Sequence, residues 1–521
     1  MIPATNLGRL LSQTARRLPD ARALIWRDQA WSWAELNARV DRLAAALRAH
    51  GIGQGDRVLV HARNGNAMFE SLWATWKIGG VWVPTNVRLT PPEVAYLAEA
   101  SGARVMLRDH GFAAHADAVR EAAPGCRLVI AVGDARANEA DYETLLTEAT
   151  PPPLNHEAEV GRDDPCWFFF TSGTTGRPKA AVLTHGQMGF IITNHLADLM
   201  PGLTERDVSL VVAPLSHGAG IHALCQVARG ACSVLLPGER LDPGVAWDLI
   251  ARHGVTNMFT VPTILNMLVA DPAAAPHQLR HVIYAGAPMY RADQLRAMER
   301  LGPCLVQYFG LGEVTGCITV LRPDQHSAED AAPGALSVGA PRTGMDIAIL
   351  DEEGRHAERG EICVRGPGVF AGYFQNDVAN EKAFRQGWFH TGDLGFLDRH
   401  GFLHITGRAS DMFISGGSNI YPREVEEALL THPAVVECAV VGLPDPRWGE
   451  SGVACLVLRA PTPPEELLAH LDGRLARYKH PRRLVVWDAL PKSAYGKVPK
   501  TLLAERLRAE GVGFAGPKKE N

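Results

Sequence analysis

The chain has 521 residues, too many for one ordinary core, so we expect three or four domain-sized units. Hydrophobic residues make up 46% and charged residues 21%, a balance typical of soluble globular proteins. The formal net charge of −5 argues against a nucleic-acid binder, and no apolar run approaches the roughly 18 residues of a membrane-spanning helix.

The first clear elements lie in residues 32–60. Ser32 and Glu35 have the spacing of a capping box, which predicts that a helix begins here. The apolar residues that follow recur at helical spacing, and Gly51 is typical of the residue that closes a helix. Val58–Val60 then predicts a buried strand.

Further short apolar runs recur through the middle of the chain, with amphipathic stretches between many of them. They are 208–213, 234–236, 258–261 and 282–285. Fully buried strands that alternate with amphipathic helices are typical of parallel sheets covered by helices. We therefore predict an α/β fold whose large N-terminal domain contains two helix-covered β-sheet subdomains.

Residues 361–407 have a different pattern, because glycine and aromatic residues crowd short strand-like runs. This pattern predicts a small β-rich subdomain. After Arg408 we expect a smaller α+β unit. Its predicted elements are a helix over 423–430, strands over 435–441 and 453–458, and a helix near 464–477. The expected domains are therefore 1–409, the large N-terminal domain, and 410–521, a smaller C-terminal domain.

Nine cysteines are scattered along the chain without a CxxC pair, so the spacing of a zinc site is absent. An odd count in a long chain indicates reduced thiols and a cytosolic setting. Buried packing is favoured over catalysis for these thiols. The C-terminal Lys-Lys-Glu-Asn matches no peroxisomal or retention signal, so we expect a cytoplasmic protein.

The segment Thr171-Ser-Gly-Thr-Thr-Gly-Arg-Pro-Lys179 concentrates groups that bind phosphate. It holds four hydroxyls, two glycines and a lysine. Glycines let backbone N–H groups approach phosphate oxygens, hydroxyls add hydrogen bonds, and Lys179 adds positive charge. Phe168–Phe170 predicts a strand directly before the loop. The segment does not match the Walker A pattern, and an ordinary Gly/Thr turn is the alternative interpretation.

Further motifs follow in a fixed order along the chain. They are Tyr284-Ala-Gly-Ala-Pro288, Gln307-Tyr-Phe-Gly-Leu-Gly-Glu313, Gly360–Gly366, Thr391-Gly-Asp393, Gly407-Arg408 and Pro491–Lys497. Together with residues 171–179, this series resembles the adenylate-forming superfamily of acyl-CoA synthetases, luciferases and peptide-synthetase adenylation domains. The resemblance covers nearly the whole chain and implies ATP-dependent activation of a carboxylic acid.

The resemblance implies a role for each matching residue. Lys497 would supply the positive charge that stabilises the transition state, and Lys500 is the next candidate for this role. Glu313 would hold Mg²⁺ against the phosphates, and Phe309 would stack on adenine. The implied nucleotide contacts are Thr171, Ser172, Gly173, Thr174, Thr175, Gly176, Lys179, Gly286, Ala287, Pro288, Gln307, Phe309, Gly310, Asp393 and Arg408. Without the family, these residues would be interpreted as surface charges, turn residues and a core phenylalanine.

Two positions depart from the family pattern. Gly312 stands where the family usually has a threonine that contacts the α-phosphate, so a hydroxyl is missing unless water or Thr315 replaces it. Ser410 stands where a hinge aspartate or lysine is usual. Serine tolerates the same backbone change, so we expect altered kinetics rather than inactivity.

A second group of residues resembles the thioester-forming face of the family. Ser415, Gly416 and Gly417 resemble the loop that lines the pantetheine tunnel, although a flexible turn is the alternative. Trp448 and Tyr478 would stack on the adenine of coenzyme A. Lys479 and His480 would contact its phosphates.

The segment Pro214–Gly220 resembles the gate of the acyl pocket, with His217 at its mouth beside the reacting carboxylate. Peptide-synthetase domains usually place an aspartate after an aromatic residue here, and its absence argues against an amino-acid substrate. Gly218, Gly220 and Gly286 are expected to leave room for an acyl or aryl group. Fatty, aryl and short-chain acids all remain open.

The main hypothesis is therefore an AMP-forming acid–CoA ligase that uses ATP, Mg²⁺ and coenzyme A. One rival is an adenylating enzyme that loads a carrier protein. A second is a catalytically impaired nucleotide-binding homologue, motivated by Gly312 and Ser410. The expected partners are a small carboxylic acid and CoA, with no nucleic acid and no integral membrane segment. The oligomeric state stays open, with a homodimer as one alternative.

Overall fold

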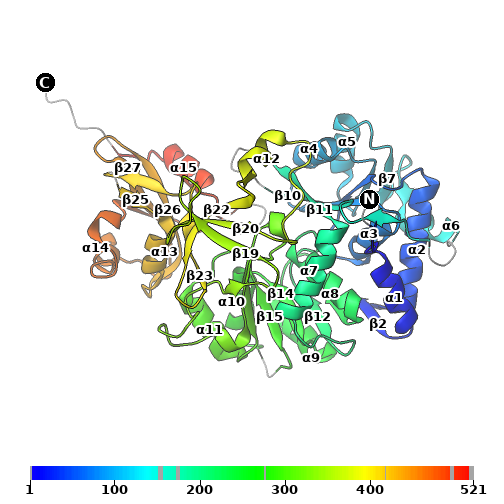
Figure 1. Ribbon diagram of the computed structural model, residues 1–521, viewed down its shortest axis with the longest axis horizontal. Coiled ribbons are helices and arrows are strands. Elements are labelled where there is room, and N and C mark those ends of the chain that lie inside the picture. Colours follow the sequence, from blue (N-terminus) through cyan, green and yellow to red (C-terminus); the bar gives the residue numbers. More distant parts are fainter. Residues whose placement is uncertain are drawn as a thin grey trace. The chain divides into compact units, whose positions relative to one another are not determined.

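A computed structural model describes residues 3–150, 156–171, 177–274, 277–416, 418–492 and 498–514 (Figure 1). The chain forms two compact units. Unit 1 comprises Met1–Pro288, Leu295–Ile347 and Val364–Phe389, and unit 2 comprises Met289–Gln294, Ala348–Cys363 and His390–Asn521. The expected boundary between residues 409 and 410 stays a prediction.

The first large sheet of unit 1 has seven strands, and all neighbours are parallel except β10 and β11. In spatial order they are β11 (Lys179–Thr184), β10 (Pro165–Thr171), β5 (Val81–Pro84), β4 (Arg57–His61), β6 (Val105–Arg108), β7 (Leu128–Ala131) and β8 (Ala140–Asp141). The helices of this region are α1 (Arg9–Arg17), α2 (Trp33–Ala49), α3 (Asn66–Lys77), α4 (Pro91–Ser101), α5 (Ala113–Ala122) and α6 (Tyr142–Glu148). A separate pair, β1 (Pro3–Ala4) and β9 (Val160–Gly161), is antiparallel.

The second large sheet of unit 1 has nine strands, of which the central ones are parallel. In spatial order they are β18 (Ala340–Pro341), β17 (Thr319–Leu321), β16 (Leu305–Phe309), β15 (His281–Tyr284), β14 (Asn257–Thr260), β12 (Val208–Val211), β13 (Cys232–Leu235), β2 (Arg22–Trp26) and β3 (Gln29–Ser32). Its helices are α7 (His185–Asp198), α8 (Gly218–Arg229), α9 (Pro243–His253), α10 (Pro262–Ala270), α11 (Arg291–Leu301) and the 3-10 turns η1 (Gly312–Val314) and η2 (Pro323–Gln325). The predicted runs of the middle region are therefore confirmed as buried strands.

A smaller sheet confirms the β-rich region predicted over 361–407. Its strands are β19 (Asp346–Leu350), β20 (Gly360–Arg365), β22 (Trp388–Leu397) and β21 (Phe384–Arg385), with β23 (Leu403–Arg408) on β22. The helix α12 (Asp377–Ala383) precedes β21. These strands carry Asp393 on β22 and Arg408 on β23, the two residues expected at the ribose.

The end of unit 2 is an α+β arrangement, as predicted. Its sheet contains β25 (Ser418–Ile420), β24 (Phe413–Ser415), β27 (Gly449–Leu458) and β26 (Val435–Asp445), with β28 (Arg483–Val486) on β27. The helical elements are α13 (Pro422–Leu430), α14 (Pro464–Ala469), η3 (Arg477–Lys479) and α15 (Lys500–Ala509). The helix expected near 464–477 is wrong in length, because the chain turns after Ala469 and Gly473 takes a φ of +76°.

The local signals at residues 32–60 are confirmed in detail. The backbone N–H of Glu35 donates to Ser32 Oγ over 3.2 Å, and the Ser32 N–H donates to Glu35 Oε2 over 2.8 Å. All nine cysteines are buried and unbridged, as predicted for packing residues. Within the described ranges, no helix is both long and apolar enough to span a bilayer.

Five histidines of unit 1 are buried in the fold, and they make its stability depend on pH. Burial lowers the pKa of all five; they are His61, His185, His195, His222 and His281. The unfolded chain binds protons on these groups below pH about 6.5, whereas the folded chain does not, so stability falls as pH falls. Each group contributes up to about 1.4 kcal/mol per pH unit in that window.

We therefore expect the melting temperature to fall markedly between pH 7.5 and pH 5. Fluorescence of the buried tryptophans of unit 1, such as Trp73 and Trp167, is the measurement. His61→Leu should reduce the slope with pH, since it removes one proton acceptor from the unfolded state. Equal melting temperatures at the two pH values would contradict the neutral state of these side chains.

Candidate active site

The hydroxyl-rich segment connects two antiparallel strands rather than a strand and a helix. Thr171 ends β10, Lys179 begins β11, and the two residues face each other in register. The strand predicted by Phe168–Phe170 is therefore confirmed. Ser172, Gly173, Thr174, Thr175 and Gly176 lie outside the described residues, so their predicted phosphate contacts stay predictions.

Glu313 lies at the centre of a polar group built by three separate segments of unit 1. Its side chain belongs to η1 and is buried. Oε1 accepts hydrogen bonds from Thr171 Oγ1 over 3.0 Å and from the Tyr373 hydroxyl over 2.9 Å. The carboxylate therefore has a fixed position beside Thr171, the first residue of the expected phosphate loop.

Tyr373 is a residue of this group that the sequence interpretation missed. Burial raises the pKa of its hydroxyl, and the negative charge of Glu313 raises it further. The hydroxyl therefore stays protonated and donates to Glu313. Lys179 Nζ lies 5.2 Å from the centre of the Tyr373 ring, which places its cation on the same group.

The structure explains why residue 312 is glycine. A Cβ atom at Gly312 would lie 2.6 Å from Cδ1 of Phe169 and 3.0 Å from Cγ2 of Thr171. Real side chains do not approach so closely, so the Phe169 ring occupies the space that a threonine would need. Thr315, offered as a substitute donor, has a φ of 48° and a buried hydroxyl, and its role stays a prediction.

His217 lies next to this group. It precedes the first residue of α8, and its ring packs edge to face on Phe169 with centroids 5.4 Å apart. Ser216 Oγ lies 2.8 Å from His217 Nδ1. Phe169 thus lies against both His217 and the position of Gly312, so it separates the expected acyl gate from the turn that carries Glu313.

The glycines of the gate do not leave the room that we expected. A Cβ at Gly218 would lie 2.5 Å from the Phe259 ring, and one at Gly220 would lie 2.1 Å from the carbonyl oxygen of Leu215. These glycines are needed because protein atoms already fill the space. The expectation is wrong for Gly218 and Gly220. Among the residues that the structure describes, only Val261 comes within 4 Å of a Cβ built at Gly286, at 3.9 Å, and Gly286 has a φ of +82°.

The expected adenine contacts lie at the carboxyl ends of β15 and β16. Gly286, Ala287 and Pro288 are exposed directly after β15, and Phe309 is half-buried at the end of β16. Gln307 is buried and accepts a hydrogen bond from the Tyr284 hydroxyl over 3.0 Å. Ligands of open α/β sheets bind at this edge of a sheet.

Gly310 follows directly and has a structural reason to be glycine. A Cβ there would lie 2.4 Å from Cα of Gly316. The chain turns back on itself at this point, and the turn brings Glu313 to the end of β16. The motif at residues 307–313 is therefore one compact turn.

In unit 2, Asp393 and Arg408 face each other across β22 and β23. Arg408 Nε donates to Asp393 Oδ1 over 2.8 Å. Asp393 is 4% exposed, whereas the Arg408 side chain is 45% exposed. The two expected ribose ligands thus belong to one ion pair, in which the buried carboxylate is positioned by the more exposed guanidinium.

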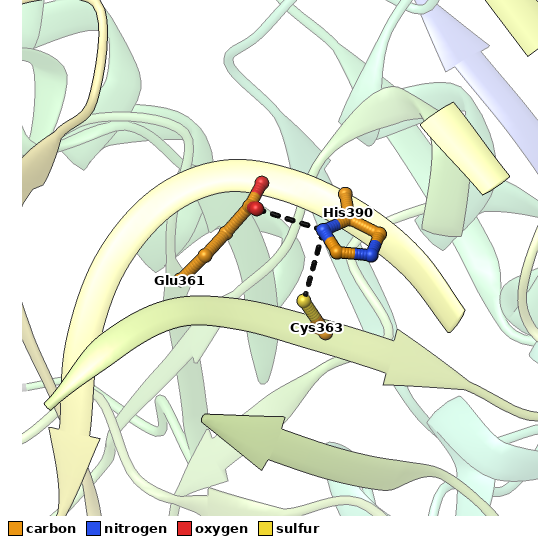
Figure 2. A group of neighbouring side chains, drawn as sticks. All are labelled: Glu361, Cys363 and His390. Atoms are coloured by element: carbon orange, nitrogen blue, oxygen red, sulfur yellow. Dashed lines mark hydrogen bonds and ion pairs between the residues drawn. The ribbon is translucent and has the colours of Figure 1, made fainter. Parts of the chain in front are cut away.

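Glu361 stabilises the turn that precedes Asp393. Glu361 Oε1 accepts from the Gly392 N–H over 3.0 Å, and Oε2 lies 2.7 Å from His390 Nδ1. Figure 2 shows that Cys363 also points at this ring, with Sγ 3.3 Å from Nδ1. The ligand atoms of the three residues lie within 4.8 Å of one another, an arrangement that the sequence interpretation missed.

Of the expected CoA-binding residues, Ser415 and Gly416 lie beside Trp448 in unit 2. Ser415 ends β24, and Gly416 takes a φ of +57° with its N–H on the Trp448 carbonyl, 2.8 Å away. A Cβ at Gly416 would lie 2.9 Å from the Trp448 ring, so glycine lets the indole lie against the backbone. Gly417 lies outside the described residues, and Tyr478 is 55% exposed.

The cations beside Trp448 are two arginines that the sequence interpretation missed. The guanidinium carbons of Arg482 and Arg447 lie 4.7 and 5.0 Å from the centre of the indole. The expected phosphate ligands are engaged elsewhere. Lys479 pairs with Glu424, and the Nε2 of His480 lies 3.2 Å from the carbonyl oxygen of Leu475.

Lys497, the expected transition-state cation, lies outside the described residues. Its nearest rival, Lys500, is ion-paired with Glu426 at the start of α15. Ser410, at the expected hinge, is exposed and its hydroxyl bonds to Asp411 Oδ1 over 3.2 Å. The ion pair engages Lys500, and the role expected of Lys497 stays a prediction.

Comparisons with known proteins give the family. The family model described as AMP-binding enzyme matches residues 11–374, and that described as AMP-binding enzyme C-terminal domain matches residues 424–497. The chain is 38% identical over 510 residues to a feruloyl-CoA synthase of Amycolatopsis sp, covering 96% of this chain and 99% of the relative. It is 34% identical over 503 residues to the 2-succinylbenzoate–CoA ligase of Bacillus subtilis (strain 168), covering 96% and 98%.

A solved structure is similar over the same extent. The o-succinylbenzoate CoA synthetase of Bacillus subtilis, in complex with its acyl-adenylate intermediate, superposes with a TM-score of 0.85 at 34% identity, covering 96% of this chain and 98% of that one. Both the order of the motifs and the arrangement of the sheets agree with this likeness. The chain belongs to the AMP-binding enzyme family of the adenylate-forming superfamily.

Proposed function

We propose that the protein is an AMP-forming acid–CoA ligase. A carboxylate oxygen attacks the α-phosphorus of ATP, pyrophosphate leaves, and the thiol of CoA then displaces AMP from the acyl carbon. The observation that carries this proposal is the group of Thr171, Glu313 and Tyr373 at the phosphate loop. The full-length likeness to enzymes named as CoA ligases supports the acceptor.

The first step brings two anions together. Two unit charges 4 Å apart repel by about 4 kcal/mol at an effective dielectric constant near 20. We propose that Lys179 and Lys497 offset this repulsion, and that Glu313 holds Mg²⁺. The carboxylate of Glu313 fits this ion because a hard cation prefers oxygen ligands, and hydroxyl donors already position the carboxylate. When bound, Mg²⁺ neutralises charge on the phosphates.

We propose that Asp393 accepts hydrogen bonds from the ribose hydroxyls and that Arg408 binds ribose or phosphate. Glu361 would act as a positioning residue, since it holds the Gly392 N–H next to Asp393. Phe309 would stack on the adenine, with Gly286, Ala287 and Pro288 beside it. Lys179, Gln307 and Gly310 complete the proposed nucleotide site.

For the second step, we propose that Ser415–Gly417 line the path of the pantetheine chain and that Trp448 and Tyr478 stack on the adenine of CoA. The arginines beside Trp448 suit its phosphates better than Lys479, whose charge is paired with Glu424. His217 would lie beside the reacting carboxylate. After adenylation, the C-terminal domain, proposed as 410–521, would rotate about a hinge at Ser410, so that Lys497 leaves and the face that binds CoA takes its place.

Lys497→Ala separates the two steps. We expect adenylation to fall about a hundredfold to a thousandfold, because one preorganised donor to developing charge is lost. Thioester formation from a supplied acyl-adenylate should stay within about twofold of the wild-type rate, since the domain motion proposed for the second step carries Lys497 away from the phosphate. Pyrophosphate exchange measures the first step and acyl-CoA appearance the second. Equal loss in both steps would contradict this role.

Arg482→Ala tests the proposed CoA phosphates. We expect the KM for CoA to rise about fivefold to tenfold, because an exposed ion pair contributes about 1 kcal/mol. ATP–pyrophosphate exchange should be unaffected, since CoA takes no part in it. Arg459→Ala is the matched control, because Arg459 is an exposed arginine that directly follows the end of β27. An unchanged KM for CoA in Arg482→Ala would contradict the assignment.

A panel of fatty, aryl and short-chain acids with ATP, Mg²⁺ and free CoA tests the proposed function. We expect acyl-CoA and AMP in equal amounts from at least one acid. If acyl-adenylate accumulates and no acyl-CoA forms, the protein is instead an adenylating enzyme that loads a carrier protein. ATP binding without turnover of any acid would favour the impaired homologue. We propose the cytoplasm as the location because all nine cysteines are unbridged.

A further inference from the structure

Glu361, Cys363 and His390 form a group of side chains in unit 2 whose combined chemistry the proposed reaction does not use. Glu361 and Cys363 lie two residues apart on β20, so they point to the same face of the strand. His390 lies on the neighbouring strand β22. Within the parts of the chain that the structure describes, this is the one group of three Cys, His, Asp or Glu side chains whose ligand atoms lie within 4.8 Å of one another. Two adjacent strands therefore assemble it without a CxxC pair.

The Nδ1 atom of His390 is the point on which the other two side chains converge (Figure 2). Glu361 Oε2 lies 2.7 Å from it, and Cys363 Sγ lies 3.3 Å from it. A ring nitrogen carries at most one proton, so one hydrogen cannot join it well to both the carboxylate and the thiol. A divalent metal ion takes several ligands, and in place of that proton it would bind all three atoms at once.

The spacing of the three atoms is close to that of ligands around one zinc ion. Bonds to zinc are about 2.0 Å long for nitrogen and oxygen and about 2.3 Å for sulfur, which in a tetrahedron places nitrogen about 3.3 Å from oxygen and about 3.5 Å from sulfur. The Nδ1–Sγ distance is therefore nearly that of a zinc site. The Glu361 carboxylate must move away from the ring by roughly 0.6 Å, which a rotation of this flexible side chain provides.

The ligand types select Zn²⁺ rather than Mg²⁺. Thiolate and imidazole are ligands of zinc, whereas magnesium prefers oxygen alone. The thiolate of Cys363 and the carboxylate of Glu361 together carry two negative charges, which balance the charge of the ion in a largely buried place. The Cys363 thiol is unbridged and therefore free to bind a metal. The Glu361 side chain is 22% exposed, so an ion can reach the group from that side.

The surrounding hydrogen bonds already position the ligands, as outer contacts do in metal sites. Glu361 Oε1 accepts from the Gly392 N–H over 3.0 Å, and Thr391 Oγ1 donates to the Ile362 carbonyl over 2.7 Å. These two bonds connect the ligand-bearing part of β20 to the turn that precedes Asp393. An ion bound to Glu361 would therefore help to fix this turn.

We propose that Glu361, Cys363 and His390 bind one Zn²⁺ ion, with a water molecule as the fourth ligand. The ion forms bonds to Oε2, Sγ and Nδ1, and the thiol of Cys363 releases its proton to solvent. This site is separate from the magnesium site proposed at Glu313, which belongs to unit 1. It goes beyond the proposed function, and its test needs neither ATP nor an acid.

A cobalt titration of the full-length protein, freed of metal by a chelator, tests the proposal. Co²⁺ takes the same ligands as Zn²⁺ but is coloured. We expect one equivalent to give the near-ultraviolet charge-transfer band of a thiolate–cobalt bond, together with the intense visible bands of a tetrahedral ion. Zn²⁺ should displace Co²⁺ and remove both signals. Excess Mg²⁺ should not, because it prefers oxygen ligands.

Cys363→Ser should abolish the charge-transfer band and weaken zinc binding at least about tenfold, since even a lost outer contact weakens metal binding by about tenfold to a hundredfold. His390→Gln should weaken zinc binding by a similar factor, and it replaces the serine variant if that variant does not fold. Cys455→Ser is the matched control, because Cys455 is a buried, unbridged cysteine on β27 of the same unit. It should change neither signal, and melting curves without metal establish that each variant is folded.

Three results would overturn the zinc site. They are the lack of a thiolate–cobalt band in the wild-type protein, a band that persists in Cys363→Ser, and a band that Cys455→Ser removes as well. In each case the three side chains only support the turn before Asp393 through hydrogen bonds. Failure of the proposed function is a separate result, because it is measured as acyl-CoA formation and not as metal binding.

Discussion

Glu313→Gln is expected to lower ATP–pyrophosphate exchange by about a hundredfold to a thousandfold. The amide keeps the volume of the side chain but loses the negative charge. A weakly held metal ion provides several kcal/mol less stabilisation of charge in the transition state. Each 1.4 kcal/mol of activation free energy changes the rate about tenfold. Raising the Mg²⁺ concentration should recover part of the rate, since the loss is one of metal affinity. Exchange rates over a Mg²⁺ titration are the measurement.

Tyr373→Phe is the matched variant for this experiment. It keeps the ring near Lys179 but removes the hydroxyl that donates to Glu313. We expect a loss of about tenfold, because one hydrogen bond to a charged group contributes about 1.5–3 kcal/mol when it is fully buried and less beside solvent. Exchange that is equally fast in Glu313→Gln and the wild-type protein, at every Mg²⁺ concentration, would show that Glu313 holds no metal.

Gly312→Thr restores the usual family residue and is nevertheless expected to lower adenylation. The new Cβ would lie 2.6 Å from the Phe169 ring, so the ring must move or the turn that carries Glu313 must shift. Overpacking of this kind costs about 1–3 kcal/mol, and we expect adenylation to fall about tenfold to a hundredfold. Pyrophosphate exchange with the best acid of the panel is the measurement.

Phe169→Val supplies the compensating change, because valine lacks the ring atoms that the threonine would meet. We expect the double variant to adenylate faster than Gly312→Thr alone, with a coupling of about 0.5–3 kcal/mol between residues in contact. The four proteins form a double-mutant cycle. A Gly312→Thr protein that is faster than the wild type would show that the missing hydroxyl limits the rate and that the ring moves at little cost.

Much of the fold follows from the sequence for a physical reason. Parallel strands covered on both faces are continuous apolar runs, so 208–213 and 282–285 were visible as strands. Ser32 and Glu35 encode the start of α2 within four residues. The helix near 464–477 was overestimated, because the periodicity continues past Ala469 while Gly473 adopts a left-handed conformation that ends helices.

The partners within the site were not visible in the sequence, because they are far apart along the chain. Tyr373 lies 60 residues after Glu313, and no motif around it predicts its hydrogen bond to Glu313. Phe169 explains Gly312 only once β10 and η1 are brought together. The room expected at Gly218 was likewise wrong, since a glycine signals close approach without showing whether a ligand or Phe259 approaches.

The central claim is that the carboxylate of the acid attacks the α-phosphorus of ATP. An acid labelled with ¹⁸O in its carboxylate, incubated with the protein, ATP, Mg²⁺ and CoA, tests it most directly. The account predicts one ¹⁸O atom in the phosphate of AMP and one in the carbonyl of the acyl-CoA, because the bridging oxygen of the adenylate leaves with AMP. Labelled orthophosphate with ADP as the nucleotide product, or unlabelled AMP, would contradict it.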